Sequence, residues 1–357
     1  MSNIYQETSR ALNDNLQSLS RAAVDLLYAQ QPQEWGKYGA KGRAASLRDM
    51  GFHLVYLSVA IETETPMLFE DYVSWARVLF DGINLPPETL TRTLEATRVV
   101  ARQQLAPEMA AVIDLYIKIA CWRLQEPASP PPIFIDERLP LGGLAKDYLD
   151  ALLRGERHVA AHLILDAHAR GVDVRDLYLF VFQRVLYEEG RLWHTNQISV
   201  AQEHFITYIT QLLMSQLTRG INITACLGHS LVAASVEGDL HDIGLRMVAD
   251  FFEMAGWEPY FLGANTPNES ILRTLAKQQP DLLLISVTTT AYLSQAEELI
   301  ARVREIHGGQ VKVLVGGYPF NLSETLWQTV GADGYGRDAQ QALEVATRLV
   351  GGRSSGL

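Results

Sequence analysis

The chain has 357 residues, of which 48% are hydrophobic and 20% charged, a composition ordinary for a soluble globular protein of two or three domains. Its net charge of −11 and the lack of a basic cluster argue against nucleic-acid binding. No apolar stretch reaches membrane length, no signal peptide is evident, and Cys121 and Cys226 lack metal-ligand spacing, so we expect a cytoplasmic protein without a membrane partner.

Residues 1–126 show helical periodicity and no strand alternation. Pro66, Pro86-Pro87 and Pro107 stand at or before the first turns of helical patterns, where proline is tolerated. We expect helices near residues 7–29, 46–61, 66–82, 87–105 and 106–124. This region is therefore predicted to be a helical domain.

A proline-rich linker over residues 127–141 precedes a second helical region over residues 142–222. Apolar residues recur every four positions in this region, as in Leu177, Val181 and Val185, and such stripes bury against neighbours in a bundle. We expect helices near 143–154, 156–170, 173–191 and 198–219. The pattern predicts a four-helix bundle.

Residues 223–357 alternate between apolar runs and helical patterns, which indicates an α/β domain. The runs 231–234, 281–288 and 311–315 read as buried parallel strands. Open parallel sheets bind ligands outside the carboxyl ends of their strands. The residues expected to converge on that edge are Asp239, His241, Gly244, Ser286, Thr288, Gly316 and Gly317.

The stretch Asp239-Leu-His241-Asp242-Ile-Gly244 follows the first of these runs. A loop histidine can bind a metal held by a planar cofactor, and Asp239 can hydrogen-bond the other ring nitrogen and fix the tautomer. Gly244 leaves room for a bulky ligand near the backbone. Taken alone, the motif also fits a strand-to-helix turn with an aspartate cap.

The ordered set D-x-H-x-x-G, S-x-T and G-G resembles the cobalamin-binding domain of the methionine synthase and mutase families, over about residues 225–350. The resemblance implies a flavodoxin-like fold with His241 as the lower cobalt ligand. It also implies that the nucleotide tail of the cofactor lies between Ser286 or Thr288 and the turn at Gly316-Gly317.

A helical bundle before such a domain resembles the cap of methionine synthase, which covers the upper face of the corrin. Trp193-His194 and Glu203-His204 resemble the cap of the adenosylcobalamin-dependent photoreceptors of the CarH type. The resemblance implies that Trp193 packs on the adenosyl group, that Glu203 and His204 line its pocket, and that His194 binds cobalt after light breaks the cobalt–carbon bond. We expect Trp193 in the loop after the third helix and Glu203-His204 on the fourth.

The aromatic residues of the first domain resemble the globin-like sensor region of some bacterial signalling proteins, among them the photocobilins, which add a biliverdin chromophore. A bilin needs stacking aromatics and cations for its propionates. His53, Tyr56, Tyr72, Trp75 and Arg77 could supply them, although each also fits an ordinary core or surface position. His53 alone could suggest haem, and Cys121 could attach a bilin, although an inert buried thiol is favoured.

These resemblances predict a light sensor rather than an enzyme, and a reductase or mutase is the least favoured interpretation because no catalytic barrel is evident in the sequence. Light would break the cobalt–carbon bond of bound adenosylcobalamin and change conformation or oligomeric state. No MerR-type DNA-binding domain is evident, so we expect a light-dependent homo-oligomer and a separate output signalling protein. The alternatives are a corrinoid methyl-carrier protein that serves a separate methyltransferase, and a stress-signalling adaptor with cobalamin as a passive effector.

Overall fold

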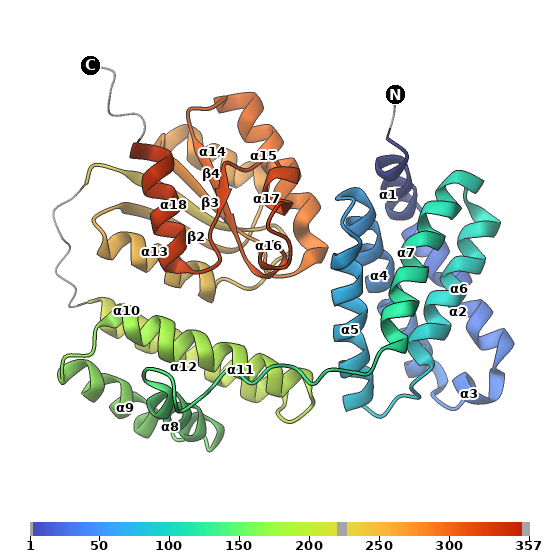
Figure 1. Ribbon diagram of the computed structural model, residues 1–357, viewed down its shortest axis with the longest axis horizontal. Helices are drawn as coiled ribbons and strands as arrows, with labels where there is room; N and C mark the ends of the chain where they lie inside the picture. The colour runs from blue at the N-terminus through green and yellow to red at the C-terminus, as the bar shows by residue number, and fades with distance from the viewer. Residues whose placement is uncertain (1–2, 220–226, 352–357) are drawn as a thin grey trace. The chain divides into compact units, whose positions relative to one another are not determined.

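The computed structural model describes residues 3–219 and 227–351 of the chain. The chain divides into two compact units, Met1–Pro130 and Pro131–Leu357 (Figure 1). Residues 127–136, which join the two units, form neither helix nor strand, as their prolines dictate. Cys226 lies outside the described residues.

The first unit is helical throughout its described part. Its helices are α1 (Ile4–Asp14), α2 (Leu16–Gln30), α3 (Pro32–Gly36), α4 (Gly39–Glu62), α5 (Pro66–Gly82), α6 (Thr89–Gln104) and α7 (Pro107–Gln125). Helix α4 packs against α1, α2 and α5, and its hydroxyl at Ser58 bonds Ser9 of α1 at 2.9 Å. The prolines at the starts of α5 and α7 occupy first-turn positions, where their missing N–H has no helical partner to lose.

Two helix boundaries in this unit differ from the sequence prediction. The single helix expected over 7–29 is two helices, because Asn15 leaves helical geometry and its side-chain amide donates to the carbonyl of Ala11 at 2.9 Å. Helix α4 begins at Gly39 instead of near residue 46. Gly42 permits that early start, since a β-carbon there would lie 2.1 Å from Cβ of Tyr38.

The second unit begins with a helical bundle. It consists of α8 (Gly142–Leu153), α9 (Arg157–Ala169), α10 (Val174–Leu177), the π-helical turn η1 (Tyr178–Phe182), α11 (Gln183–His194) and α12 (Val200–Thr218). The helix predicted over 173–191 continues to His194, so Trp193 lies in the last turn of α11 and its prediction as a loop residue is wrong. The helical run ends only at Asn196, whose φ of 57° is left-handed, and a capping box at Ser199 starts α12.

A five-stranded parallel sheet follows, with strand order β2-β1-β3-β4-β5. The strands are β1 (Ser230–Val236), β2 (Glu258–Thr266), β3 (Leu282–Ser286), β4 (Lys312–Gly316) and β5 (Gly334–Tyr335). The parallel α/β architecture is confirmed, and this order is that of flavodoxin-like sheets. Strands β2 and β5 were not predicted: β2 lies at an edge and is partly exposed, and β5 has two residues.

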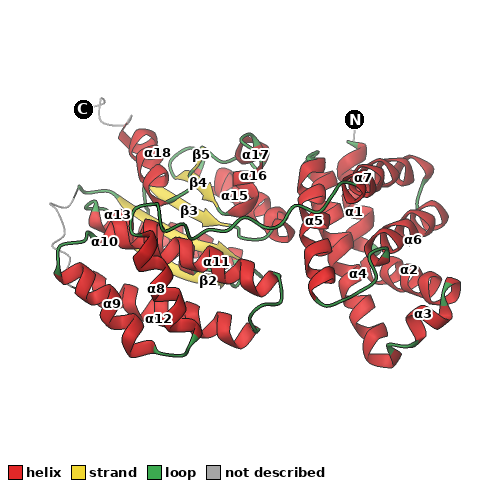
Figure 2. Ribbon diagram, turned by 60° about the horizontal axis from the view of Figure 1, so that its bottom comes forward, coloured by secondary structure: helices red, strands yellow, loops and turns green. Residues whose placement is uncertain are grey.

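Helices cover both faces of this sheet (Figure 2). They are α13 (Ile243–Met254), α14 (Asn268–Gln278), α15 (Leu293–His307), α16 (Tyr318–Leu322), α17 (Leu326–Thr329) and α18 (Ala339–Gly351), with a 3₁₀ turn η2 (Thr290–Tyr292). Helix α13 packs against α18, and its Met247, Phe251 and Met254 join the hydrophobic core of the bundle. The bundle and the sheet domain are therefore held together by a shared apolar core. Among the described residues, no helix is both long and apolar enough to cross a membrane.

Candidate functional site

The loop after β1 places a histidine beside a buried carboxylate. Nδ1 of His241 lies 2.7 Å from Oδ1 of Asp239, and the His241 side chain is 60% exposed while Asp239 is fully buried. The second carboxylate oxygen of Asp239 accepts the backbone N–H of Thr288 at 2.6 Å. The backbone after strand β3 thus fixes Asp239, and Asp239 in turn orients the imidazole of His241. Because Asp239 engages Nδ1, Nε2 is the ring nitrogen available to a ligand.

The ends of three neighbouring strands meet at this loop. Ser235 of β1 pairs with Ser286 of β3, and Ser286 pairs with Gly316 of β4. The Ser235 hydroxyl donates to the carbonyl of His241 at 2.9 Å, which ties the loop to the strand end. The predicted residues of the S-x-T and G-G motifs therefore lie at the same sheet edge as His241, as the topology of a parallel sheet requires.

Glycines keep the backbone of this edge bare. A β-carbon at Gly317, where φ is 109°, would lie 1.9 Å from the carbonyl oxygen of Val287, so only glycine fits. At Gly316 the nearest atom would be the Gly336 carbonyl oxygen at 3.2 Å. Gly244 differs, since a β-carbon there would meet nothing within 4 Å. The α-carbon of Gly244 therefore borders open space, as expected where a bulky ligand approaches the backbone.

Helix α12 of the bundle faces the His241 loop. Its Gln211 side chain donates to Oδ1 of Asp242 at 3.4 Å. The hydrogen bond with Asp239 raises the pKa of His241, and the negative charges of Asp239, Glu203 and Asp242 raise it further. The Glu203 carboxylate of the bundle thus lies close enough to the His241 loop for its charge to affect the imidazole.

The other predicted cap residues lie near the ends of α11 and α12. Trp193 is 36% exposed and His194 is buried. His204 is largely exposed, and its Nδ1 pairs with the Glu203 carboxylate. The cap therefore presents an aromatic ring and a carboxylate from two adjoining helix ends.

Three residues near the His241 loop or on helix α12 were not singled out by the sequence analysis. Tyr208 is 64% exposed and lies one helical turn from both His204 and Gln211, so it shares their face of α12. Leu240, inside the loop motif, is 73% exposed. Asn265 accepts the backbone N–H of Gly238 at 2.8 Å and steadies the start of the loop. Unexpected exposure of large apolar side chains is the signal that identifies Tyr208 and Leu240, and it is visible only in the fold.

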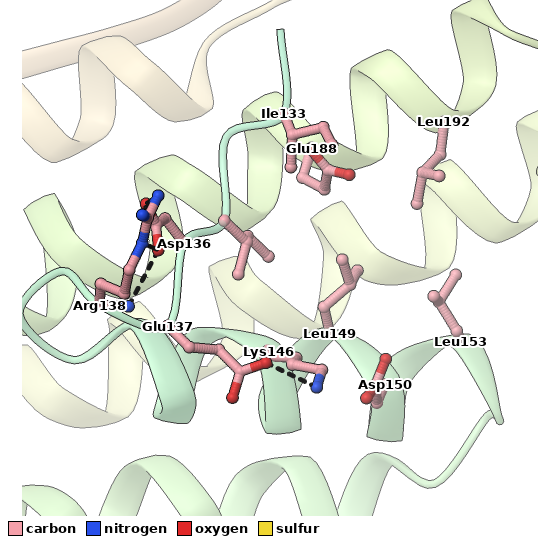
Figure 3. Close-up of a pocket in the computed structure, with 11 residues that line it drawn as sticks. Ile133, Asp136, Glu137, Arg138, Lys146, Leu149, Asp150, Leu153, Glu188 and Leu192 are labelled. Carbon is pink, nitrogen blue, oxygen red and sulfur yellow. Dashed lines mark hydrogen bonds and ion pairs between the residues drawn. The ribbon is translucent and has the colours of Figure 1, made fainter.

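A separate cavity of about 710 Å³ lies between the linker and the bundle (Figure 3). Its walls include Ile133 of the linker, Leu149 of α8 and Leu192 of α11. Glu188 at its edge accepts the backbone N–H of Phe134 at 2.9 Å and pairs with Arg191. None of the predicted site residues lines it, so this cavity is distinct from the site at His241.

In the first unit, the predicted aromatic residues form one cluster. Nδ1 of His53 lies 2.7 Å from the Tyr72 hydroxyl, and the Tyr72 ring stacks on Tyr56 with centroids 3.8 Å apart. The Trp75 ring is nearly parallel to that of Tyr72, with ring centroids 6.4 Å apart. Burial lowers the pKa of His53 to about 4 and raises that of Tyr72. The histidine is therefore neutral at physiological pH.

Arg77 and Cys121 have other surroundings. Nη1 of Arg77 donates to the carbonyl oxygens of Leu124 and Glu126, so the guanidinium caps the end of α7. Burial raises the pKa of the Cys121 thiol to about 11, with the nearby Glu95 charge adding to it. A protonated thiol is a poor nucleophile, which fits the inert alternative for Cys121.

Comparison with known protein families gives three matches. Residues 229–344 match a family model described as a B12 binding domain, and residues 144–218 match a second model with the same description. Residues 3–124 match a model described as phycobilisome protein. The two B12 models cover the bundle and the sheet domain, and the cobalamin-binding prediction is confirmed for this part of the chain.

A corrinoid protein of Desulfitobacterium hafniense is 32% identical over 214 residues, which are 58% of this chain and 98% of the relative. The dimethylamine corrinoid protein 2 of Methanosarcina acetivorans is 27% identical over 47% of this chain and 82% of its own length. The monomethylamine corrinoid protein of Methanosarcina barkeri has the same fold, with a TM-score of 0.53 and 22% identity over 59% of this chain and all of that chain.

These relatives overturn the expected partners. The prediction of a light-dependent homo-oligomer that acts on a separate signalling protein is wrong, because the similar proteins are corrinoid proteins, several of them named for dimethylamine or trimethylamine. The second unit matches two models of B12 binding domains, and the chain belongs to the corrinoid proteins.

Proposed function

We propose that the corrinoid lies between the strand edge and helix α12, with His241 as the lower cobalt ligand. Nδ1 of His241 is engaged by Asp239, and the exposed ring presents Nε2, the nitrogen suited to a metal. The bond from the Thr288 N–H keeps Asp239 in place, so the ligand and its supporting carboxylate are already oriented. The open space beside Gly244 supports the approach of a bulky ring.

The nucleotide tail of the cofactor is proposed to enter at the strand ends. Ser286 and Thr288 supply hydroxyl groups on one side, and the turn at Gly316 and Gly317 supplies bare backbone on the other. A β-carbon at Gly317 would clash with the carbonyl oxygen of Val287, so this position accepts only glycine. The turn therefore carries no side chain there that could narrow the proposed entry.

The function that the comparisons favour is methyl carriage for a separate methyltransferase. The observation that carries it is the similarity to a corrinoid protein over 98% of that protein's length, together with relatives named for dimethylamine and trimethylamine. Cobalt in a corrinoid takes up and gives up a methyl group. In this function, Asp239 would keep the imidazole of His241 in one tautomer. The helical bundle would shield the opposite face of the corrinoid.

The test is a titration of the apoprotein in the dark with methylcobalamin and, separately, with adenosylcobalamin. A methyl carrier is expected to bind methylcobalamin at least as tightly as adenosylcobalamin, and to pass the labelled methyl group on only when a methyltransferase is added. Binding of adenosylcobalamin alone would contradict methyl carriage.

A second function, sensing of light through adenosylcobalamin, is supported by specific cap residues. Trp193 offers a flat indole on which adenine can stack, and Glu203 offers oxygens for ribose hydroxyls. His194 would serve as the new cobalt ligand after photolysis, with His204 beside the nucleoside. A methyl group needs none of these contacts. Illumination of the adenosylcobalamin-loaded protein is then expected to change its absorption spectrum irreversibly, and an unchanged spectrum would remove this candidate.

A bilin in the first unit is supported by the match of residues 3–124 to phycobilisome proteins. Tyr56, Tyr72 and Trp75 supply stacked aromatic rings beside the neutral His53. The globin-like arrangement of this unit stays a prediction. Addition of biliverdin to the apoprotein is expected to give a red-absorbing species. Loss of that species in Tyr72→Ala, with corrinoid binding retained, would locate the chromophore, whereas its absence from the wild type would contradict the bilin proposal.

A further inference from the structure

Glu189 on α11 is a buried carboxyl group with one oxygen left without a partner. The residue is 3% exposed, and its Oε1 lies at hydrogen-bond distance, 2.8 Å, from Oγ1 of Thr207. Oε2 is buried and has no hydrogen-bond partner among the described residues. No Lys or Arg side chain in the described part of the chain forms an ion pair with it. An ionised carboxylate in such surroundings is strongly disfavoured.

Thr207 on α12 stands between Glu189 and Glu203. Its hydroxyl oxygen is 2.8 Å from Oε1 of Glu189 and 3.5 Å from Oε1 of Glu203. A hydroxyl group has one hydrogen and can donate to only one of these carboxyls at a time. The protonation of Glu189 therefore decides where the Thr207 hydrogen points.

Few other charged or titratable groups face Glu189. From α12 the facing groups are Thr207 and the Glu203 carboxylate, and from α8 the facing group is Tyr148, whose hydroxyl bonds Thr210 at 3.0 Å. Burial raises the pKa of Glu189 to about 8, and the charge of Glu203 acts in the same direction. The carboxyl is thus neutral at neutral pH.

We propose that Glu189 is a positioning residue, which as a neutral acid supports Glu203 through the hydroxyl of Thr207. The O–H of Glu189 donates to Oγ1 of Thr207, and the Thr207 O–H donates to the Glu203 carboxylate. When Glu189 loses its proton, the Thr207 hydrogen turns to Glu189, and Glu203 loses its donor while it faces a second negative charge. The inference rests on the proposed place of Glu203 above the corrinoid.

The first test needs no cofactor. The infrared difference spectrum between wild-type apoprotein and Glu189→Gln is expected to show the carbonyl band of a protonated carboxyl at neutral pH, and this band should fade as the pH rises through about 8. A difference spectrum with carboxylate bands alone at neutral pH would overturn the proposal.

The second test measures the dark affinity for adenosylcobalamin at neutral pH and above pH 8. The wild type is expected to lose affinity by about tenfold at the higher pH, the value of one hydrogen bond to a charged group. Glu189→Gln, whose amide donates to Thr207 at every pH, is expected to keep the neutral-pH affinity throughout. Thr207→Val is expected to bind weakly at both pH values.

Thr210→Val is the matched control, because this buried hydroxyl lies on the same helix and bonds Tyr148 instead of Glu189. It should retain the pH dependence of the wild type. Equal pH dependence in the wild type and Glu189→Gln would disprove the role of Glu189 while leaving the corrinoid function intact. A wild type that binds neither adenosylcobalamin nor methylcobalamin at either pH would refute the corrinoid site itself and, with it, this inference, whereas a wild type that binds methylcobalamin alone would overturn only the role of Glu189 toward the adenosyl group.

Discussion

Two histidines, one in each unit, have opposite surroundings. His241 is 60% exposed on its side chain and bonds the buried carboxylate of Asp239, whereas His53 is buried and bonds the hydroxyl of Tyr72. The carboxylate raises the pKa of His241, and burial lowers that of His53 to about 4. The difference shows that neighbours decide the state of an imidazole: one ring is exposed and oriented by a carboxylate, and the other is kept neutral inside a helical unit.

The largest effect that would sharpen this comparison is acid destabilisation of the first unit. The folded-state pKa of His53, about 4, lies below its ordinary value of 6.5, so the unfolded state binds more protons between these pH values. Stability contributed by the neutral imidazole is therefore complete above about 6.5 and is lost as the pH falls toward 4. The expected loss is ~3 kcal/mol, at 1.4 kcal/mol per pKa unit.

Hydrogen exchange of the whole chain measures this loss, with peptides from α4 and α5 as the probe and peptides from α13 as the internal reference. His53→Gln should remove the loss of protection in α4 and α5 that occurs as the pH falls from 6.5 toward 4. It isolates the histidine from Asp49, whose pKa is raised by burial and which acts with the opposite sign. A variant as acid-sensitive as the wild type would refute the assignment to His53.

The next effect concerns the other histidine. His241→Ala is expected to weaken hydroxocobalamin binding about a hundredfold, ~2.7 kcal/mol, because the only imidazole oriented by Asp239 is removed. The absorption spectrum of the protein bound to cobalamin should shift to that of cofactor without an imidazole ligand. His158→Ala on α9 is an exposed control and should bind as the wild type does. An unaltered spectrum in His241→Ala would place the lower ligand elsewhere.

Asp239→Asn is expected to have a smaller effect, about tenfold on corrinoid affinity, typical for a residue that orients a metal ligand. The amide oxygen of the variant can still accept the Thr288 N–H. The variant lacks the negative charge that favours one tautomer of the His241 imidazole. Asp242→Asn, three residues along the same loop and bonded to Gln211, is the matched control. Equal losses in the two variants would mean that loop charge, and not orientation of His241, controls binding.

The sequence predicted the sheet domain and the residues that converge on one of its edges, because buried parallel strands leave continuous apolar runs and their ends are set by topology. Asp239, His241, Ser286 and Gly316 meet as expected. Strand β2 escaped prediction because an exposed edge strand lacks an apolar run. The break at Asn15 depends on one side-chain bond that periodicity cannot reveal.

The cap was harder to predict. Motif spacing indicated Trp193 and Glu203, but it gave no sign that α11 continues past Trp193 or that Tyr208 shares the face of Gln211. A glutamate pair such as that at residues 188–189 is ordinary at the solvated end of a helix, so the sequence alone does not predict that Glu189 is buried. Only the packing of α11 against α12 shows that it is buried beside Thr207.

The smallest effect would test whether the Tyr72 hydroxyl is what keeps His53 in place. Tyr72→Phe removes the hydroxyl and leaves Nδ1 of a buried imidazole without its partner, so we expect a loss of ~1 kcal/mol in the stability of the first unit. The stacking of this ring on Tyr56 is retained in the variant, which separates the hydrogen bond from the aromatic packing.

Denaturant unfolding followed by hydrogen exchange in α4 measures the loss, and Tyr56→Phe is the control. Because His53 is held by a neutral hydroxyl and not by a carboxylate, the variant should leave hydroxocobalamin affinity unchanged, whereas a drop in that affinity would contradict the separation of the two histidines.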